Sequence, residues 1–366
     1  MEEQTIVLID LPALSTPETL PLVVGIDLGG TQIRAAALRG ATLLSRVSLL
    51  TGENPTPERV IPRMLNAVHQ ALSDVNVSPD QIAGVGIGAP GPLSGRTGMV
   101  FSPPNLPEWN NVALRDTFHE KLNIPIFLER DTNAAVLAEY MFGAGRGYQE
   151  VVYLTISTGI GGGVIANGQL LEGATGTAAE LGHMTIDWRG PRCNCGNIGC
   201  LESIASGTAI ARRANERIAL GHSDGAALLE FVLIHCQQEL KANVPESSNQ
   251  AVITPIQVNA RMVALAAEAG IPLAREIINS AADALGVGLV NIIHIFNPEV
   301  IILGGGVTQI GEPLQGPAKR IVQERAMTVP RETAHIVQAE LGNDVGLIGA
   351  GTLVYSKLAK EARSPK

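Results

Sequence analysis

Short apolar runs and stretches of helical periodicity alternate along this chain. Two apolar runs, 22–28 and 32–38, flank a Gly-Gly-Thr turn, which is the pattern of a β-hairpin. The pattern returns at 151–166, where two apolar runs flank a turn rich in glycine. This repetition indicates an internally duplicated fold with one glycine turn in each domain.

The remaining periodic stretches predict further strands and helices in alternation. Strands are expected at 82–89, 124–129 and 300–303. Helices are expected at 57–72, 131–142, 205–219, 225–240, 257–269, 275–296 and 346–359. Alternating strands and helices favour an α/β fold with mixed sheets.

The length of 366 residues is enough for two domains that each bury a core. We expect a small α/β domain at 22–137 plus 346–366. A large α/β domain is expected at 138–345, and it contains a cysteine-rich loop. Residues 1–21 show no clear period and are interpreted as an N-terminal extension.

The charge and the apolar pattern exclude several classes of protein. A net charge of −9 disfavours a nucleic-acid surface, which requires clustered Lys and Arg. No apolar run approaches the roughly 18 residues that cross a bilayer, and the N-terminus lacks the basic region of a signal peptide. We therefore expect a cytoplasmic protein that binds neither nucleic acid nor membranes.

The run 180–202 holds three of the four cysteines. Three thiolates and one imidazole complete a tetrahedral shell for Zn²⁺ and leave no position open for water. A disulfide is the alternative, but Cys-x-Cys is too tight for easy bridging, and so few thiols indicate an intracellular chain. The predicted ligands of this structural zinc site are His183, Cys193, Cys195 and Cys200.

Carboxylates stand at both ends of the same run, at Glu180 and Glu202. Either acid could simply be solvated. A loop that is fixed by a metal, however, favours acids that are directed at a polar ligand. If one ring nitrogen of His183 binds zinc, the other is a donor available to a hydroxyl group.

Three glycine runs are candidate phosphate-binding turns, because backbone N–H groups without nearby Cβ atoms can converge on phosphate oxygens. They are neither a Walker A loop nor a dinucleotide fingerprint. One such run alone is often only a tight turn, and three together are more specific. Asp27 could also hold Mg²⁺ through water. The candidate residues are Asp27, Gly29, Gly30, Thr31, Thr158, Gly159, Gly161, Gly304 and Gly305.

Asp131 follows a predicted strand and opens a predicted helix. It suits a helix N-cap, and it equally suits a general base that takes a proton from a hydroxyl attacking phosphorus. Sequence position alone does not separate these two roles. Asn105 lies in a loop bounded by prolines and by itself is interpreted as a turn residue.

These motifs resemble those of the ROK family, which comprises sugar kinases and related repressors with the two-domain actin-like ATPase (ribonuclease H-like) fold. The run Cys193-x-Cys195-Gly196-x-x-Gly199-Cys200-x-Glu202 is similar to the zinc signature of that family. The three glycine runs resemble its two phosphate turns and its adenosine-side loop. The resemblance extends from about Val23 to the predicted C-terminal helix.

The resemblance implies phosphorylation of a hexose with Mg-ATP, most often glucose at its 6-hydroxyl, by a homodimer or higher homo-oligomer. It implies that Asp131 is the catalytic base. It also implies that the sugar-hydroxyl ligands are Asn105, Glu180, His183 and Glu202. Another hexose (N-acetylmannosamine, N-acetylglucosamine, mannose or fructose) and a non-catalytic sugar sensor are the alternatives. Family repressors carry a DNA-binding domain before the first glycine turn. In this chain, only some twenty residues precede that turn.

Two positions depart from the family pattern. Gln32 stands where the family often has Lys, and Arg130 stands where it usually has Asn. Arginine offers only donors and is longer than asparagine. Arg130 is therefore expected either to turn away from the sugar or to add donors to it. Both arrangements predict poorer use of glucose than an asparagine-bearing relative shows, or a preference for another sugar.

Overall fold

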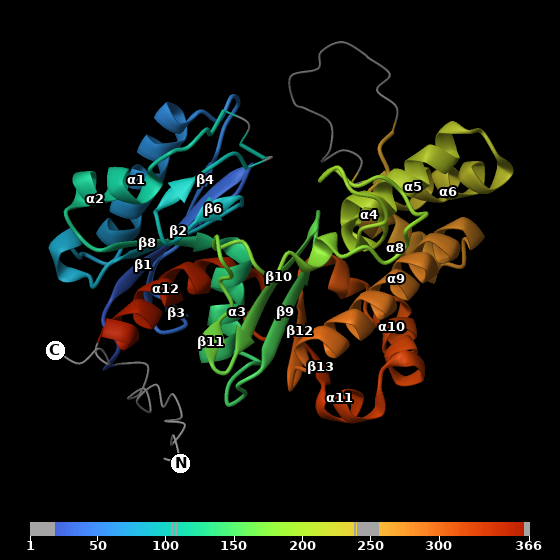
Figure 1. The fold of residues 1–366 in the computed structure, drawn as a ribbon. Helices are drawn as coiled ribbons and strands as arrows, with labels where there is room; N and C mark the ends of the chain where they lie inside the picture. Colours follow the sequence, from blue (N-terminus) through green and yellow to red (C-terminus); the bar gives the residue numbers. More distant parts are fainter. Residues whose placement is uncertain (1–18, 104, 107, 238, 240–255, 362–366) are drawn as a thin grey trace, which may run out of the picture. The chain divides into compact units, whose positions relative to one another are not determined.

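A computed structural model gives the fold of the chain and describes residues 19–103, 105–106, 108–237, 239 and 256–361. The predicted extension at 1–21 therefore lies almost wholly outside the described residues. Contacts divide the chain into two compact units (Figure 1). Unit 1 is Met1–Tyr153, Gly162–Ala179 and Val337–Lys366, and unit 2 is Leu154–Gly161 and Glu180–Ile336. The predicted domain boundaries, at 137/138 and 345/346, stay a prediction.

Unit 1 contains a sheet of six strands in the order β3-β2-β1-β5-β8, with β4 also paired to β2. The strands are β1 (Val23–Leu28), β2 (Gln32–Arg39), β3 (Thr42–Leu43), β4 (Val47–Leu50), β5 (Val85–Ala89) and β8 (Ile126–Arg130). β1 and β2 pair antiparallel, which confirms the predicted hairpin. β5 runs parallel to β1, and β8 runs parallel to β5. The sheet is therefore mixed, as predicted.

Helices cover both faces of this sheet (Figure 1). Their bounds are α1 (Pro57–Ser73), α2 (Leu114–Leu122), α3 (Asp131–Phe142) and α12 (Val345–Glu361). Side chains alternate between the two faces of a strand. In β1, Val24 and Ile26 accordingly join the core with α1 and α2, whereas Val23 joins the core with α12. Shorter elements of unit 1 are η2 (Pro79–Gln81), β6 (Leu93–Ser94), β7 (Met99–Val100) and η5 (Gly342–Asp344).

Two strand glycines let α12 approach the sheet closely. Gly25 and Gly86 are paired across β1 and β5. A Cβ atom on Gly25 would lie 2.3 Å from the carbonyl oxygen of Leu347, and one on Gly86 would lie 1.8 Å from that of Ala350. Neither position has room for a side chain. The backbone of α12 therefore rests directly on the sheet.

A second sheet has the strand order β11-β10-β9-β12-β13. Its strands are β9 (Val151–Ile156), β10 (Ile160–Ala166), β11 (Gln169–Leu170), β12 (Val300–Gly304) and β13 (His335–Gln338). β9 and β10 flank the second glycine turn, as the sequence predicts. The helices of unit 2 are η3 (Leu181–His183), α4 (Leu201–Ala205), α5 (Gly207–Ala219), α6 (Ser223–His235), α8 (Ala260–Glu268), α9 (Pro272–Phe296), η4 (Gly306–Ile310), α10 (Glu312–Arg325) and α11 (Thr328–Thr333).

The helix α9 packs against α4, α5, α6, α8 and α10. By length and composition it is one described helix that could cross a membrane, and α5 with α6 passes the same test only as a pair bent by 115°. Within α9, 67% of the apolar window is buried inside the fold. Burial to this extent is typical of a helix in the core of a fold.

Several predicted elements differ in extent from those observed. The predicted helix 205–219 is preceded by α4, and the chain breaks at Ser206, whose hydroxyl caps α5 by accepting from the N–H of Ala209. The predicted helix 225–240 corresponds to α6, which ends at His235; the chain breaks at Cys236, and residues 238 and 240 lie outside the described residues. The helices α2, α10 and α11 were not predicted. α10 contains Pro317, a residue that usually argues against a helix interior.

Candidate functional site

The first glycine turn is closed by hydrogen bonds within unit 1. The N–H of Gly29 donates to the carbonyl of Gln32 at 2.8 Å, and the hydroxyl of Thr51 donates to the carbonyl of Gly29 at 2.8 Å. Asp27 lies just before the turn and accepts from Nε of Arg34 at 3.0 Å. Asn105 lies against the turn, because a Cβ on Gly30 would be 3.0 Å from that of Asn105. Two predicted groups, the turn and Asn105, are therefore adjacent.

Asp131 is the first residue of α3, and its side chain is exposed. Its Oδ1 accepts from the N–H of Thr132 at 2.7 Å. The residue in the N-cap position is Arg130, so Asp131 lies within the first turn at the positive end of the helix dipole. The role of Asp131 as a base stays a prediction.

A buried polar network stands directly beside Asp131. Oε1 of Glu129 accepts from the N–H of Arg130 and from Nδ2 of Asn133, both at 2.9 Å. Asn133 is fully buried, and burial raises the pKa of Glu129 above its usual value. Neither Glu129 nor Asn133 was predicted as a site residue. The signal available in the sequence was a set of polar residues at the junction of an apolar strand with a helix.

The four predicted zinc ligands converge in unit 2. Their ligand atoms lie within 4.8 Å of one another. Sγ of Cys193 is 3.7 Å from Nδ1 of His183, and the Sγ atoms of Cys195 and Cys200 are 3.7 Å apart. Tetrahedral zinc, with Zn–S near 2.3 Å and Zn–N near 2.1 Å, places neighbouring ligand atoms about 3.6–3.8 Å apart. The residues therefore fit zinc, and all the cysteines are free thiols.

The loop that carries the thiols depends on its glycines. Gly199 has φ of +68°, and a Cβ there would lie 1.5 Å from the carbonyl oxygen of Asp187. Only glycine fits that position. The loop turns back there, so that Cys200 pairs with Thr185 in an isolated bridge. Burial raises the pKa of the Cys200 thiol to about 12, so a bound metal must displace its proton.

The cysteine-rich loop, residues 180–202, also contacts the second glycine turn. Glu202, in the first turn of α4, accepts from the N–H of Ile160 at 2.8 Å through Oε2. A Cβ on Gly182 would lie 1.9 Å from the carbonyl oxygen of Ile160. The turn is thus held at its N–H by Glu202, and the backbone of Gly182 packs closely against its carbonyl. Glu180 precedes the short helix η3, and His183 is the last residue of that helix.

The second and third glycine runs lie close together in unit 2. A Cβ on Gly305, which has φ of +91°, would be 2.4 Å from the carbonyl oxygen of Ile156. The N–H of Gly207, at the start of α5, donates to the carbonyl of Ser157 at 2.8 Å. The hydroxyl of Thr208 donates to the carbonyl of Thr158 at 2.8 Å. A helix N-terminus beside glycine turns is a common arrangement for binding phosphate.

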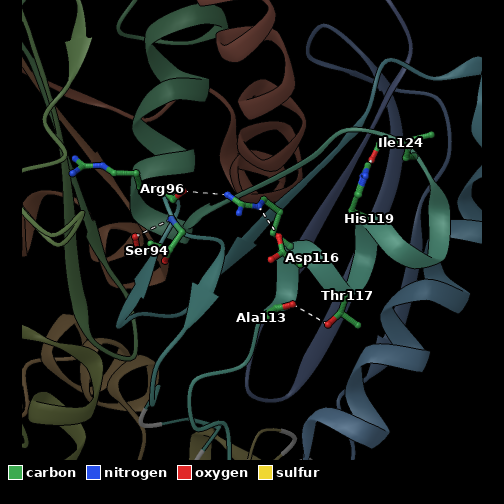
Figure 2. Close-up of polar contacts among 9 residues, drawn as sticks. Ser94, Arg96, Ala113, Asp116, Thr117, His119 and Ile124 are labelled. Carbon is green, nitrogen blue, oxygen red and sulfur yellow. Dashed lines mark hydrogen bonds and ion pairs between the residues drawn. The ribbon is translucent and has the colours of Figure 1, made fainter.

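Unit 1 also contains a cavity of about 820 Å³. Strand β8 and helices α3 and α12 contribute to its lining, and Glu129, Arg96 and Arg115 are among the lining residues. Figure 2 shows Arg96 and the neighbouring helix α2. Arg115 donates to the carbonyl of Arg96 at 3.2 Å and to Oδ1 of Asp116 at 3.1 Å. None of the residues predicted for the site lines this cavity.

Comparison with known proteins agrees with these features. The sequence matches the profile of the ROK family over residues 23–357. It is 37% identical to a glucokinase from Thermotoga maritima over 337 residues, which are 92% of this chain and 98% of that protein. A xylose repressor from Caldicellulosiruptor bescii is 29% identical over 92% of this chain and 78% of its own length.

A solved structure shows the same fold. The ROK family glucokinase from Streptomyces griseus, in complex with glucose and AMPPNP, superposes with a TM-score of 0.73 at 31% identity, covering 92% of this chain and 99% of that chain. The predicted two-domain actin-like ATPase fold with mixed α/β sheets is therefore confirmed. By sequence and by fold, this chain belongs to the ROK family.

Proposed function

We propose that this protein is an ATP-dependent sugar kinase that phosphorylates glucose at the 6-hydroxyl. The observation that carries the proposal is the match, over more than nine-tenths of the chain, to glucokinases, one of them solved with glucose and AMPPNP. The exposed carboxylate of Asp131 and the glycine runs supply the groups that this reaction needs. The reaction is the ATP-dependent entry of glucose into glycolysis.

The reaction transfers one phosphoryl group from ATP to the sugar. Asp131 takes the proton of the 6-hydroxyl while that oxygen attacks the γ-phosphorus, and ADP leaves. The backbone N–H groups of the glycine runs would hold the phosphates of Mg-ATP, and Asp27 would help to hold its Mg²⁺. The residues proposed for ATP are Asp27, Gly29, Gly30, Thr31, Thr158, Gly159, Gly161, Gly304 and Gly305.

The proposed sugar ligands are Asn105, Glu180, His183 and Glu202. Several directed polar groups discriminate among polyols better than an apolar pocket does, because a mismatched hydroxyl leaves a polar group unpaired. One oxygen of Glu202 is committed to the N–H of Ile160. The other oxygen, Oε1, lies 3.9 Å from Sγ of Cys193. A sugar hydroxyl would bind at Oε1.

We also propose that His183, Cys193, Cys195 and Cys200 hold a structural zinc ion. The donor set and the 3.7 Å separations support it. With all four ligand positions supplied by the protein, the ion has no role in the chemistry of phosphoryl transfer. It would hold Glu180 and Glu202 in place.

The proposed assembly is a homodimer or a higher homo-oligomer in the cytoplasm. Exposed apolar side chains on unit 2 support self-association; they include Ile295, Met327 and Val329. The free thiols suit a reducing compartment. Light scattering on the purified protein gives its mass, and a monomeric mass would contradict the proposed assembly.

The proposed activity is tested by measuring ATP consumption with Mg²⁺ and a panel of sugars. The panel comprises glucose, mannose, fructose, N-acetylglucosamine and N-acetylmannosamine. We expect the highest kcat/KM with glucose, and a 6-phosphate product in the ³¹P NMR spectrum. A higher value for another sugar would identify a different hexose kinase. Sugar binding without ATP consumption would identify a non-catalytic sensor.

A further inference from the structure

Arg130 ends β8, and its side chain is only 3% exposed. Its Nη2 donates to the carbonyl of Ala178 and, at 3.1 Å, to Oδ1 of Asn133. The aliphatic stem passes beside Gly91, where a Cβ would lie 3.3 Å from Cδ of Arg130. These contacts direct the guanidinium at acceptors of the protein itself.

Ala178 belongs to the connector 172–179, which joins β11 to η3. The residue after it, Ala179, has φ of +64°, a conformation that residues with a side chain rarely adopt. The carbonyl of Ala178 is part of the peptide bond that leads into Ala179. A donor that holds this carbonyl therefore restrains the backbone at the strained position. The next residue is Glu180, where the chain enters unit 2.

We infer that Arg130 is a positioning residue for the connector 172–179 and is not a ligand of the sugar. It holds the Ala178–Ala179 peptide and so sets the direction in which the chain reaches Glu180. The inference rests on the proposed function, because Glu180 is a proposed sugar ligand. It deepens that proposal by assigning part of the sugar specificity to a residue that acts through the backbone.

The chemistry of the side chain supports this role. A guanidinium can bond two acceptors in fixed directions, and hydrogen bonds from a charged donor are stronger than neutral ones. Here one acceptor, Asn133, is itself anchored to Glu129 at the end of β8. The connector is therefore fastened to the strand end next to Asp131. Both bonds come from one nitrogen, Nη2, at the far end of the side chain. A lysine side chain is one atom shorter and an asparagine side chain is shorter still, so neither places a donor at that position.

Arg96 offers a matched control, because it contacts the same connector from the surface. Its Nη1 donates to the carbonyl of Ala174 at 3.4 Å, and its Nη2 lies 3.6 Å from Oε2 of Glu172. Its side chain is 62% exposed. Exposed pairs of this kind contribute little. Removing Arg96 should therefore leave the connector in place.

The first measurement compares the kinetics of Arg130→Met, Arg130→Lys, Arg130→Asn and Arg96→Met. We expect Arg130→Met to raise the KM for glucose about 10- to 100-fold, the range for loss of a charged hydrogen bond. Its KM for ATP should stay within twofold of the wild-type value. Its kcat should depend on pH as that of the wild type does. The KM for glucose of Arg130→Lys should lie between those of the wild type and Arg130→Met. The KM of Arg96→Met should match that of the wild type. A rise in kcat/KM for glucose in Arg130→Asn would overturn the inference and make Arg130 a sugar ligand.

The second measurement is hydrogen exchange without any substrate, so it does not depend on the proposed activity. Exchange over 172–180 should increase in Arg130→Met and in Arg130→Lys, and it should stay unchanged in Arg96→Met. Unchanged exchange in both Arg130 variants would overturn the inference. A wild type that phosphorylates no sugar in the panel would refute the proposed function alone, because the exchange result stands without it.

Discussion

Asp131 is the residue on which the proposed phosphoryl transfer depends most directly. Changing it to Asn keeps its shape and can keep a hydrogen bond to the N–H of Thr132, but it removes the proton acceptor. We expect kcat to fall about 10²- to 10⁴-fold while glucose affinity changes little. Steady-state kinetics and glucose binding on Asp131→Asn measure both quantities.

A matched control for this change is Asp116→Asn. Asp116 is also an acid in the first helical turn, that of α2, and it pairs with Arg115 on the surface. It should retain kcat within twofold. Turnover by Asp131→Asn within a few-fold of the wild type would assign Asp131 to the helix terminus instead.

Glu129 gives a prediction about pH. Burial is the main reason that its pKa lies above 4.5, the ordinary value. An acid with a raised folded-state pKa binds its proton more tightly when folded, so its contribution to stability falls as pH rises from 4.5 through the raised pKa. Glu129→Gln does not titrate. The free energy of unfolding of the wild type, relative to this variant, should therefore decrease with pH across that window.

Urea unfolding of both proteins at a series of pH values tests this dependence. A difference for Glu129→Gln that is flat or increases with pH would contradict a raised pKa.

Local spacing explains which site residues could be predicted. The four thiol and imidazole ligands lie within one run of 18 residues in sequence, from His183 to Cys200, and zinc chemistry requires them to meet. Glu129 and Asn133 could not be found that way. Their role depends on burial against other segments, which no local spacing reveals. The contact between Glu202 and the N–H of Ile160 likewise joins segments that are distant in the sequence.

Among the elements, the contact between α12 and the sheet is the most sensitive to side-chain size. A Cβ on Gly86 would lie 1.8 Å from the carbonyl oxygen of Ala350. Gly86→Ala must therefore push the helix away, and overpacking of this kind costs about 1–3 kcal/mol or more. We expect a lower free energy of unfolding and a lower Tm for this variant.

The matched control lies two residues along the same strand. A Cβ on Gly88 would have ordinary contacts, the nearest at 3.8 Å. Thermal and urea unfolding should therefore show that Gly88→Ala is much less destabilising than Gly86→Ala. Equal losses in the two variants would mean that the cost reflects glycine in a strand rather than contact with α12.

Periodicity predicted the elements with strong patterns. The helix at 131–142 and the strands of both glycine hairpins were found with correct or nearly correct bounds. The break at Ser206 was missed, because a serine inside an apolar pattern looks like any polar position until its hydroxyl is seen to cap a helix. In α10, Pro313 and Pro317 obscured a helix that packing against α9 stabilises.

At the scale of the whole molecule, the chain passes between the two units several times. The segment 154–161 belongs to unit 2, although the residues on both sides of it in the sequence belong to unit 1. The whole of 138–345 was predicted to form one domain, because periodicity along the sequence does not show which distant segments pack together. Contacts such as that between Glu202 and Ile160 hold the segment 154–161 within unit 2. The glycine turn therefore depends on the fold of unit 2 as well as on its own residues.

This dependence predicts how far the loss of the metal is felt. Cys195 is the exposed ligand, so Cys195→Ser removes a thiolate with little loss of packing. We expect zinc to be released and glucose affinity to fall, because metal binding is coupled to folding of the loop. Hydrogen exchange should increase over 180–202 and, through Glu202 and Gly182, over 157–161. Strands β1 and β5 of unit 1 should exchange as in the wild type.

Metal analysis and segment-resolved hydrogen exchange test this prediction together. Cys236→Ala is the control, because Cys236 is a buried free thiol outside the ligand cluster, and it should keep its zinc. Stoichiometric zinc in Cys195→Ser with unchanged kinetics would show that this thiol is not a ligand. An equal increase of exchange in β1 and β5 would show that the metal stabilises the whole chain. An increase confined to 180–202 would show that Glu202 does not transmit the constraint, because the turn at 157–161 would then hold without the metal.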